Sequence, residues 1–332
     1  MKLKLVGRDS MNIAFAGFRH SHILGLYDYA VKSDKVNITG CFEEEIEKAK
    51  ESVLKTRNID FKYFSYEELL EDKNIEAVAI GDYYAKRGKM VIEALKKGKH
   101  VICDKPVCTD LSELETIEKL SRDKNLQVCC MLDLRYMPQV VKVKELIKSG
   151  YIGEICNVTF TGQHHLDYGN RPSWYFEEGK HGGTINDIAI HGVDLVRFIT
   201  GKNLSKVNCA KVWNAFADKE PEFKDCGQFM AEMDDISVMA DVSYAAPKCA
   251  GMPTYWDFYF WGKDGMINFK YNDKLIRIYK QNEEIIECDE SCPTYLDDFI
   301  SEINGVSTIM KTDDILNSQK QTLILQKFAE RG

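Results

Sequence analysis

Residues 11–22 have the sequence MNIAFAGFRHSH, an apolar run that ends at Gly17. The run predicts a buried strand, and the glycine predicts a sharp turn into a helix that begins near His22. Short apolar runs and amphipathic segments then alternate along the chain, which is typical of parallel β-α units. We therefore predict an α/β fold whose first domain, residues 11–133, is a doubly wound parallel sheet. Residues 1–10 are expected to form an N-terminal extension. The helices expected in this half include residues 22–32, 45–57, 86–97 and 111–124.

The pattern changes after residue 133. Residues 154–162, 206–215 and 227–245 are β-rich, and several of them alternate apolar and polar side chains as in a sheet with one exposed face. Helical segments interrupt these runs. The second domain, residues 134–332, is therefore predicted to be α+β with a largely antiparallel open sheet. The helices expected here are residues 139–149, 185–199, 295–303 and 313–330.

Composition excludes several classes of protein. The 332 residues include 44 Lys and Arg against 52 Asp and Glu, a net charge of −8, which argues against nucleic acid as a partner. No apolar run is long enough to span a membrane and no signal peptide is evident, so we expect a cytoplasmic protein without a membrane partner. The 11 cysteines are scattered and form no Cys-x-x-Cys motif, which favours reduced thiols over disulfides or zinc.

The turn after the first predicted strand is a candidate dinucleotide site. A Gly-x-Gly-x-x-Gly run would turn the chain so that the next helix points its N-terminal amides at a diphosphate. Here only Gly17 is kept, and Arg19 and His22 occupy the positions of the other two glycines. An ordinary tight turn is the alternative interpretation.

An acidic residue supports the dinucleotide interpretation. Glu43 ends the predicted strand at residues 36–42, where a carboxylate binds the adenosine ribose in such folds. It would repel a 2′-phosphate, so NAD is favoured over NADP, although Arg19 could offset the repulsion. The alternative is that Glu43 simply starts a solvated acidic run at the beginning of a helix.

Two further motifs carry candidate chemistry. Asp104-Lys105-Pro106 follows the apolar run at residues 100–103, which places an ammonium group at the rim where ligands bind. Asp187 and His191 are four residues apart, so a helix would place both on one face, and the preceding Gly182 and Gly183 indicate close approach of the backbone to another group. A solvated lysine and an exposed polar helix face are the alternatives.

Together these motifs resemble the Gfo/Idh/MocA oxidoreductases, a family named for glucose-fructose oxidoreductase and inositol dehydrogenase. The resemblance runs over nearly the whole chain from Met11. It is carried by residues 66–70, 76–80, 94–101, 104–106, 135–138, 149–153, 173–175 and 187–191.

The resemblance implies a Rossmann domain that binds NAD or NADP, a second domain whose open sheet often forms homodimers or homotetramers, and a site built from Lys105, Asp187 and His191. The chain departs from the family pattern at Arg19 and His22, and in the loop that begins at Asp82. The residues we assign to the cofactor are Gly17, Phe18, Arg19, His20, Glu43, Asp82, Tyr83, Asp104 and Lys105.

The predicted reaction is hydride transfer between the nicotinamide and a secondary alcohol or ketone of a sugar, sugar acid or cyclitol. His191 would serve as the base and Lys105 would stabilise the developing alkoxide, while Asp187 would orient His191 or grip a neighbouring hydroxyl. No metal is expected. The residues assigned to the polyhydroxylated substrate are Arg135, His165, Trp174 and Asp187.

Two alternatives remain open from the sequence. A relative that uses bound NAD transiently to cleave a glycoside would show no net oxidation or reduction. A non-catalytic, regulatory dinucleotide-binding protein would explain the loss of two glycines from the loop.

Overall fold

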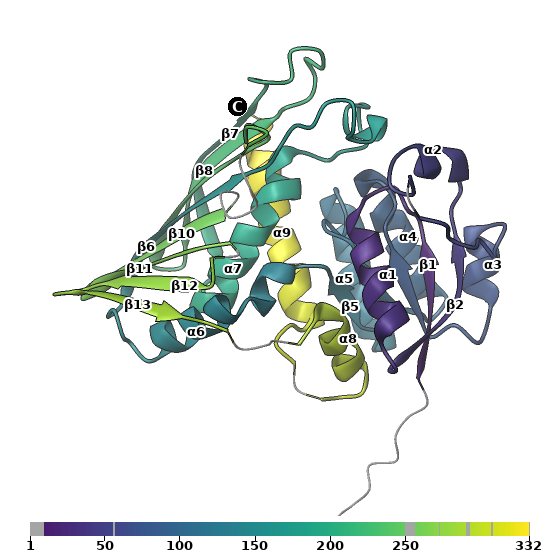
Figure 1. The fold of residues 1–332 in the computed structure, drawn as a ribbon, viewed down its shortest axis with the longest axis horizontal. Coiled ribbons are helices and arrows are strands. Elements are labelled where there is room, and N and C mark those ends of the chain that lie inside the picture. The colour runs from purple at the N-terminus through teal and green to yellow at the C-terminus, as the bar shows by residue number, and fades with distance from the viewer. Residues whose placement is uncertain are drawn as a thin grey trace, which may run out of the picture.

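The structure is a computed structural model that describes residues 10–55, 57–249, 256–271, 273–289, 293–306 and 308–331. Apart from Ser10, the predicted extension at residues 1–10 lies outside the described residues. The chain builds two sheets with helices packed on them (Figure 1).

The first sheet has five parallel strands in the order β2-β1-β3-β4-β5. Its strands β1, β3, β4 and β5 are almost completely buried, because helices cover both faces of such a sheet. This is the doubly wound, Rossmann-like architecture predicted for this half. The elements are β1 (Met11–Ala16), α1 (His22–Lys32), β2 (Val36–Phe42), α2 (Ile46–Glu51), α3 (Tyr66–Glu71), β3 (Ala77–Ile80), α4 (Tyr84–Lys96), β4 (His100–Cys103), α5 (Leu111–Lys124) and β5 (Val128–Cys130).

One helix is shorter than predicted. The pattern favoured a helix over residues 45–57, but α2 ends at Glu51. The hydroxyl of Ser52 donates to the carbonyl oxygen of Lys48 at 2.9 Å, and a serine side chain that bonds the backbone in this way competes with the next helical turn.

The second sheet has eight strands in the order β13-β12-β11-β10-β6-β9-β8-β7 and is antiparallel except for the pair β6 and β9. Residues 227–245, expected to be β-rich, form the hairpin of β8 and β9, and strands β11 to β13 were not predicted individually. The elements are η1 (Asp133–Tyr136), α6 (Pro138–Lys148), β6 (Ile155–Gln163), η2 (Ser173–Tyr175), η3 (Ile185–Ala189), α7 (Ile190–Thr200), β7 (Leu204–Trp213), β8 (Cys226–Met233), β9 (Ile236–Ser243), β10 (Trp256–Gly262), β11 (Gly265–Lys270), β12 (Leu275–Tyr279) and β13 (Glu283–Glu287).

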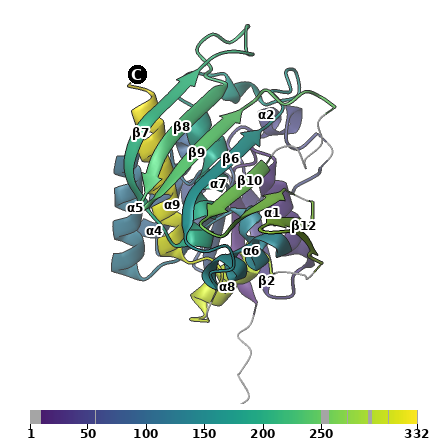
Figure 2. The same cartoon turned by 90° about the vertical axis from the view of Figure 1, so that its left-hand side faces the viewer.

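Within the described residues, helices cover one face of this sheet and the other face is open. Along β8, Phe229 and Ala231 are buried while Met230 between them is 41% exposed. Figure 2 views the sheet from its open side, with the strands in front of α7 and α9. The alternation predicted from the sequence is therefore that of an open sheet.

The end of the chain contacts both halves. Helix α8 (Tyr295–Ile303) packs into the core of the first sheet, whereas α9 (Thr312–Ala329) runs between the sheets and also packs on β7 and α7 (Figure 1). The boundary proposed between residues 133 and 134 remains a prediction. Within the described residues, no helix is both long enough and apolar enough to cross a membrane.

Candidate active site

The turn after β1 depends on Gly17. This residue has φ 80°, and a Cβ atom there would lie 2.7 Å from the backbone nitrogen of Asp82. The chain then enters α1, whose N-cap residue Ser21 makes no side-chain capping hydrogen bond. The N-terminus of α1 is therefore free of a side-chain cap, which suits an anionic group such as a diphosphate.

Arg19 stands where the family motif has its second glycine. Its side chain is buried, its guanidinium forms an ion pair with Glu45, and its Nε has no hydrogen-bond partner in the described structure. Its carbonyl oxygen accepts a hydrogen bond of 2.9 Å from the indole nitrogen of Trp174. A buried guanidinium nitrogen without a partner is a donor available to a phosphate.

Glu43 lies beside the same loop. Its carboxylate is buried and accepts hydrogen bonds from the backbone nitrogens of Phe18 (2.5 Å) and Glu45 (2.9 Å). Burial and the neighbouring carboxylate of Asp82 raise the pKa of Glu43. The structure thus brings the cofactor residues predicted at Gly17, Phe18, Arg19 and Glu43 together at the carboxyl ends of β1 and β2.

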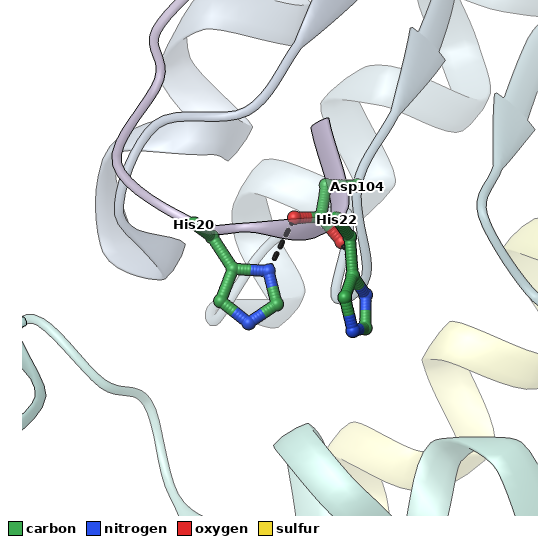
Figure 3. Close-up of side chains that lie close together, drawn as sticks. All are labelled: His20, His22 and Asp104. Atoms are coloured by element: carbon green, nitrogen blue, oxygen red, sulfur yellow. Dashed lines mark hydrogen bonds and ion pairs between the residues drawn. The ribbon is translucent and has the colours of Figure 1, made fainter. Parts of the chain in front are cut away.

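Asp104 organises the rest of this loop (Figure 3). Its Oδ2 accepts hydrogen bonds from Arg87 (3.0 Å) and from His20 Nδ1 (2.5 Å), and His22 Nδ1 lies 3.3 Å from its Oδ1. Burial opposes ionisation of Asp104, but Arg87 and the two histidines hold its pKa well below the usual value. Burial lowers the pKa of His20 to about 3, and its Nε2 lies 3.2 Å from the hydroxyl of Tyr84.

The donor atoms of His20, His22 and Asp104 lie within 4.8 Å of one another, a set that could bind a metal ion. Electrostatics disfavours a cation here, because Arg87 already balances the charge of Asp104 and the N-terminus of α1 is a positive helix end. The expectation that the site uses no metal remains a prediction.

Lys105 and Asp187 meet across the two halves of the chain. Lys105 Nζ donates to Asp187 Oδ1 at 2.5 Å and to the main-chain oxygen of Asp187 at 2.9 Å. The hydroxyl of Tyr244 donates to Oδ2, which also lies 3.5 Å from His181 Nε2. Burial opposes ionisation, but Lys105 and His181 hold the pKa of Asp187 well below its usual value. Asp187 is therefore an anion whose two oxygens are both engaged.

The helix that carries Asp187 does not run as a regular α-helix. Residues 185–189 form a π-helical turn, η3, before α7 begins at Ile190. The extra residue in a π turn changes which side chains share a face. The sequence predicted that Asp187 and His191 would stack on one face, but the structure places no hydrogen bond between them, because Asp187 is turned to Lys105.

Gly182 and Gly183 allow the close approach that the sequence predicted. A Cβ atom at Gly182 would lie 2.1 Å from the side chain of Thr109, and one at Gly183 would lie 2.1 Å from the side chain of Gln326. The amide oxygen of Gln326 in turn accepts a hydrogen bond of 2.9 Å from the backbone nitrogen of Ile185. Helix α9 therefore fixes the start of the segment that carries Asp187.

His191 is buried in the first turn of α7 and is 5% exposed. Its Nδ1 has no hydrogen-bond partner in the described structure, and the atom faces Asp133 Oδ1 at 3.9 Å. Burial, together with the charges of Lys105 and His22, holds the pKa of His191 well below 6.5. The imidazole is therefore neutral near pH 7, which is the form that accepts a proton.

The residues assigned to the substrate have different surroundings. Arg135 is buried in a two-pronged ion pair with Asp194 (2.6 and 2.5 Å), so its prediction as a substrate ligand does not fit its surroundings. Trp174 is fully buried against the loop at Arg19, and Nδ1 of His165 lies 3.0 Å from the carbonyl oxygen of Ala246. Asp187, the fourth of these residues, contacts Lys105.

Sequence reasoning missed Asp133, His181 and Tyr244. Asp133 follows β5 at the ligand-binding edge of the sheet, so its position after an apolar run was an available signal. Tyr244 and His181 come from a strand end and a loop of the second half, where no local spacing links them to Asp187. Asp82 and Tyr83, assigned to the cofactor, lie between β3 and α4, next to the turn at Gly17.

The chain matches two protein-family models. The oxidoreductase family with an NAD-binding Rossmann fold matches residues 12–131, and the GFO/IDH/MocA C-terminal domain matches residues 140–268. These two matches cover most of the chain and meet near the boundary between the two sheets.

Named relatives agree with the family models. A levoglucosan dehydrogenase of Pseudarthrobacter phenanthrenivorans is 31% identical over 145 residues, which are 42% of this chain and 36% of that protein. A myo-inositol 2-dehydrogenase of Thermotoga maritima is 25% identical over 191 residues, which are 58% of this chain and 54% of that protein. The matches thus span only about a third to a half of these curated relatives.

A solved levoglucosan dehydrogenase, in complex with NADH and levoglucosan, has the same fold. Its TM-score to this chain is 0.79 at 18% identity, with 97% of this chain and 98% of that chain covered. At this identity the likeness concerns the fold. With both family models matched in chain order and the fold shared end to end, the chain belongs to the Gfo/Idh/MocA family of oxidoreductases.

Proposed function

We propose that this protein is an NAD-dependent dehydrogenase that moves a hydride between the nicotinamide and a secondary alcohol or ketone of a sugar, sugar acid or cyclitol. The observation that carries the proposal is the meeting of Lys105, from the rim of the Rossmann sheet, with Asp187, four residues before the neutral imidazole of His191. An ammonium and a nearby base are the groups that alcohol oxidation requires.

The residues divide the chemistry between them. A bound nicotinamide would supply the hydride acceptor. His191, held neutral by its surroundings, takes the hydroxyl proton, and Lys105 donates a hydrogen bond to the oxygen as negative charge develops. Asp187 holds the ammonium of Lys105 in place, so its role is to orient Lys105 rather than His191.

The loop residues fit a dinucleotide and favour NAD. The uncapped N-terminus of α1 and the partnerless Nε of Arg19 suit the diphosphate. Glu43 presents a carboxylate at the end of β2, and this carboxylate would repel a 2′-phosphate. Fluorescence titration should show tighter binding of NAD+ than of NADP+, and the reverse order would contradict this preference.

The first experiment is a substrate panel. The names of the relatives suggest levoglucosan and myo-inositol as its first members, followed by free aldoses and sugar acids. Formation of NADH, followed at 340 nm, is expected with at least one polyol. Cleavage of a glycoside without net NADH would favour the transient-oxidation alternative, and NAD+ binding without turnover of any member would favour a regulatory protein.

We also propose that the open sheet pairs with a second copy of the chain. Met230 and Met239 are 41% and 52% exposed and border a hollow of about 470 Å³ on strands β6 to β9. Exposed apolar surface of this kind marks protein contacts. Light scattering should give a dimer or tetramer that M239K weakens, and a monomer of the unmodified chain would refute the pairing.

A further inference from the structure

A buried base must pass its proton to solvent. Oxidation of an alcohol by NAD+ gives a ketone, NADH and one proton, and in the proposed function His191 receives that proton. The imidazole is 5% exposed and lies near the cationic Lys105, so an imidazolium ion there is unfavourable. Turnover therefore needs a second group that takes the proton from His191 and meets water.

Asp133 occupies the required position. Its Oδ1 lies 3.9 Å from Nδ1 of His191, the imidazole nitrogen without a hydrogen-bond partner in the described structure. The gap is slightly longer than a hydrogen bond and closes with a small side-chain movement. The other acid near the base, Asp187, already has both oxygens engaged by Lys105 and Tyr244.

Asp133 also meets a pocket. Its side chain is 52% exposed, whereas that of His191 is 6% exposed. The pocket has a volume of about 410 Å³ and lies between α1, the end of β5 and the start of α8. Its lining residues are His22, Gly25, Asp28, Tyr29, Lys32, Met131, Asp133 and Tyr295.

The charges around Asp133 suit a proton carrier. His22, Lys105 and Asp104 lie close enough to Asp133 to act on its charge. On the side of His191, Lys105, His22 and His164 lower its pKa and Asp187 raises it. The lowered pKa of His191 favours loss of a proton from its imidazolium to the facing carboxylate.

We propose that Asp133 accepts the proton from Nδ1 of His191 and releases it to water in the pocket between α1 and α8. As Nε2 of His191 gains the hydroxyl proton, Nδ1 gives its own proton to the carboxylate, so the imidazole is neutral again and rotation or reprotonation restores its first tautomer. Charge and atoms balance, because the one proton released by the reaction leaves through Asp133. The inference rests on the proposed role of His191 as the base.

The test compares D133A and D133N with D28N. Asp28 lines the same pocket but is paired with Arg57 instead of His191, so D28N controls for a change of charge in the pocket. With the polyol that the panel identifies, kcat of D133A and D133N should fall about 10- to 100-fold while KM changes less than about threefold. D28N should keep the unmodified kcat.

Chemical rescue of D133A distinguishes a loss of proton transfer from a structural defect. In D133A, formate or acetate should restore kcat several-fold in a saturable manner, because a small acid can enter the space left at the edge of the pocket. The inference is overturned if D133A keeps its full kcat or if only KM changes. It is also overturned if rescue fails in a D133A protein whose thermal unfolding and NAD+ binding are normal.

A second measurement needs no substrate. In protein labelled with ¹³C at histidine Cε1 and assigned with H191A, the pKa of His191 should fall in D133N, because the facing carboxylate stabilises the imidazolium. An unchanged pKa of His191 in D133N would show that the two side chains do not interact and would overturn the inference. Failure of the proposed function gives a different result, because the unmodified protein would then turn over no member of the panel.

Discussion

Two buried groups four residues apart have opposite surroundings. Both oxygens of Asp187 are engaged, by Lys105 and by Tyr244, whereas Nδ1 of His191 has no hydrogen-bond partner in the described structure. Buried polar atoms are nearly always bonded, so the first environment is that of a fixed charge and the second that of an atom kept free for a reaction. This segment therefore separates a fixed half of the site from a reactive half.

Removal of Lys105 should have the largest effect. K105M leaves the Asp187 carboxylate buried without its cation, which costs about 3–5 kcal/mol of unfolding free energy. It also removes the donor to the reacting oxygen, so kcat should fall on the order of 10²- to 10³-fold. Urea unfolding and a turnover assay measure the two effects.

Lys99 provides the matched control. Its ammonium is also buried, and it donates to the carbonyl oxygens of Asp72 and Ile75 at the opposite end of the sheet. K99M should lose stability and keep kcat. A K105M protein that kept kcat would show that the Asp187 environment is purely structural.

Replacement of His191 should change turnover and spare the fold. H191A should lower kcat about 10²- to 10⁴-fold, because the base is gone. It deletes a ring that makes no recorded hydrogen bond, so the unfolding free energy should change much less than in K105M. Affinity for NAD+ should stay the same, and a destabilisation as large as that of K105M would erase the contrast between the two environments.

His20 contrasts with His191, because it is a buried histidine with both nitrogens near partners, Asp104 and Tyr84. Its folded pKa of about 3 lies below the unfolded value, so the unfolded chain binds the proton first. The stability contribution of neutral His20 is complete above about pH 6.5 and is lost as the pH falls towards 3.

The variant H20N tests the predicted direction of this pH dependence. Between pH 7 and pH 5 the unfolding free energy of the unmodified protein should fall by about 2 kcal/mol more than that of H20N, which has no group to titrate there. Urea unfolding at the two pH values measures the difference. An equal fall in unfolding free energy in both proteins would show that protonation of His20 does not contribute to the pH dependence of stability.

Tyr244 should give the smallest effect. Y244F removes one hydrogen bond to Asp187, worth about 2 kcal/mol for a charged acceptor, while Lys105 stays in place. We expect kcat to fall about tenfold, the equivalent of about 1.4 kcal/mol in the barrier. Y66F, which removes a hydrogen bond to the main-chain oxygen of Met90 far from Asp187, should leave kcat unchanged.

The sequence predicted the bounds of helices and strands correctly where the apolar pattern of a segment is complete within that segment. The helices at residues 22–32 and 111–124 and the strand at residues 36–42 have the predicted bounds, because their apolar periodicity and turns lie within each segment. Strands β11 to β13 were not predicted individually, since short strands of a hairpin sheet depend on pairing with distant segments.

The candidate site was predictable in part. The family motif indicated Lys105, Asp187 and His191, and the structure joins the first two. The sequence also suggested Arg135 as a substrate ligand, yet that side chain is committed to Asp194, a partner 59 residues away. Contacts across such a distance depend on how the two halves pack.

Sequence alone determined the two-sheet plan, the turn at Gly17 and the residue types available at the rim, because these follow from local periodicity and backbone freedom. Which acid serves which base depends on how the two halves of the chain pack together. The π turn directs Asp187 to Lys105, and the end of β5 brings Asp133 towards His191. Gln326 of α9 and Thr109 pack against the two glycines before this turn, so contacts from outside the segment hold it in place. A local sequence pattern does not encode such contacts, because their partners lie far away along the chain.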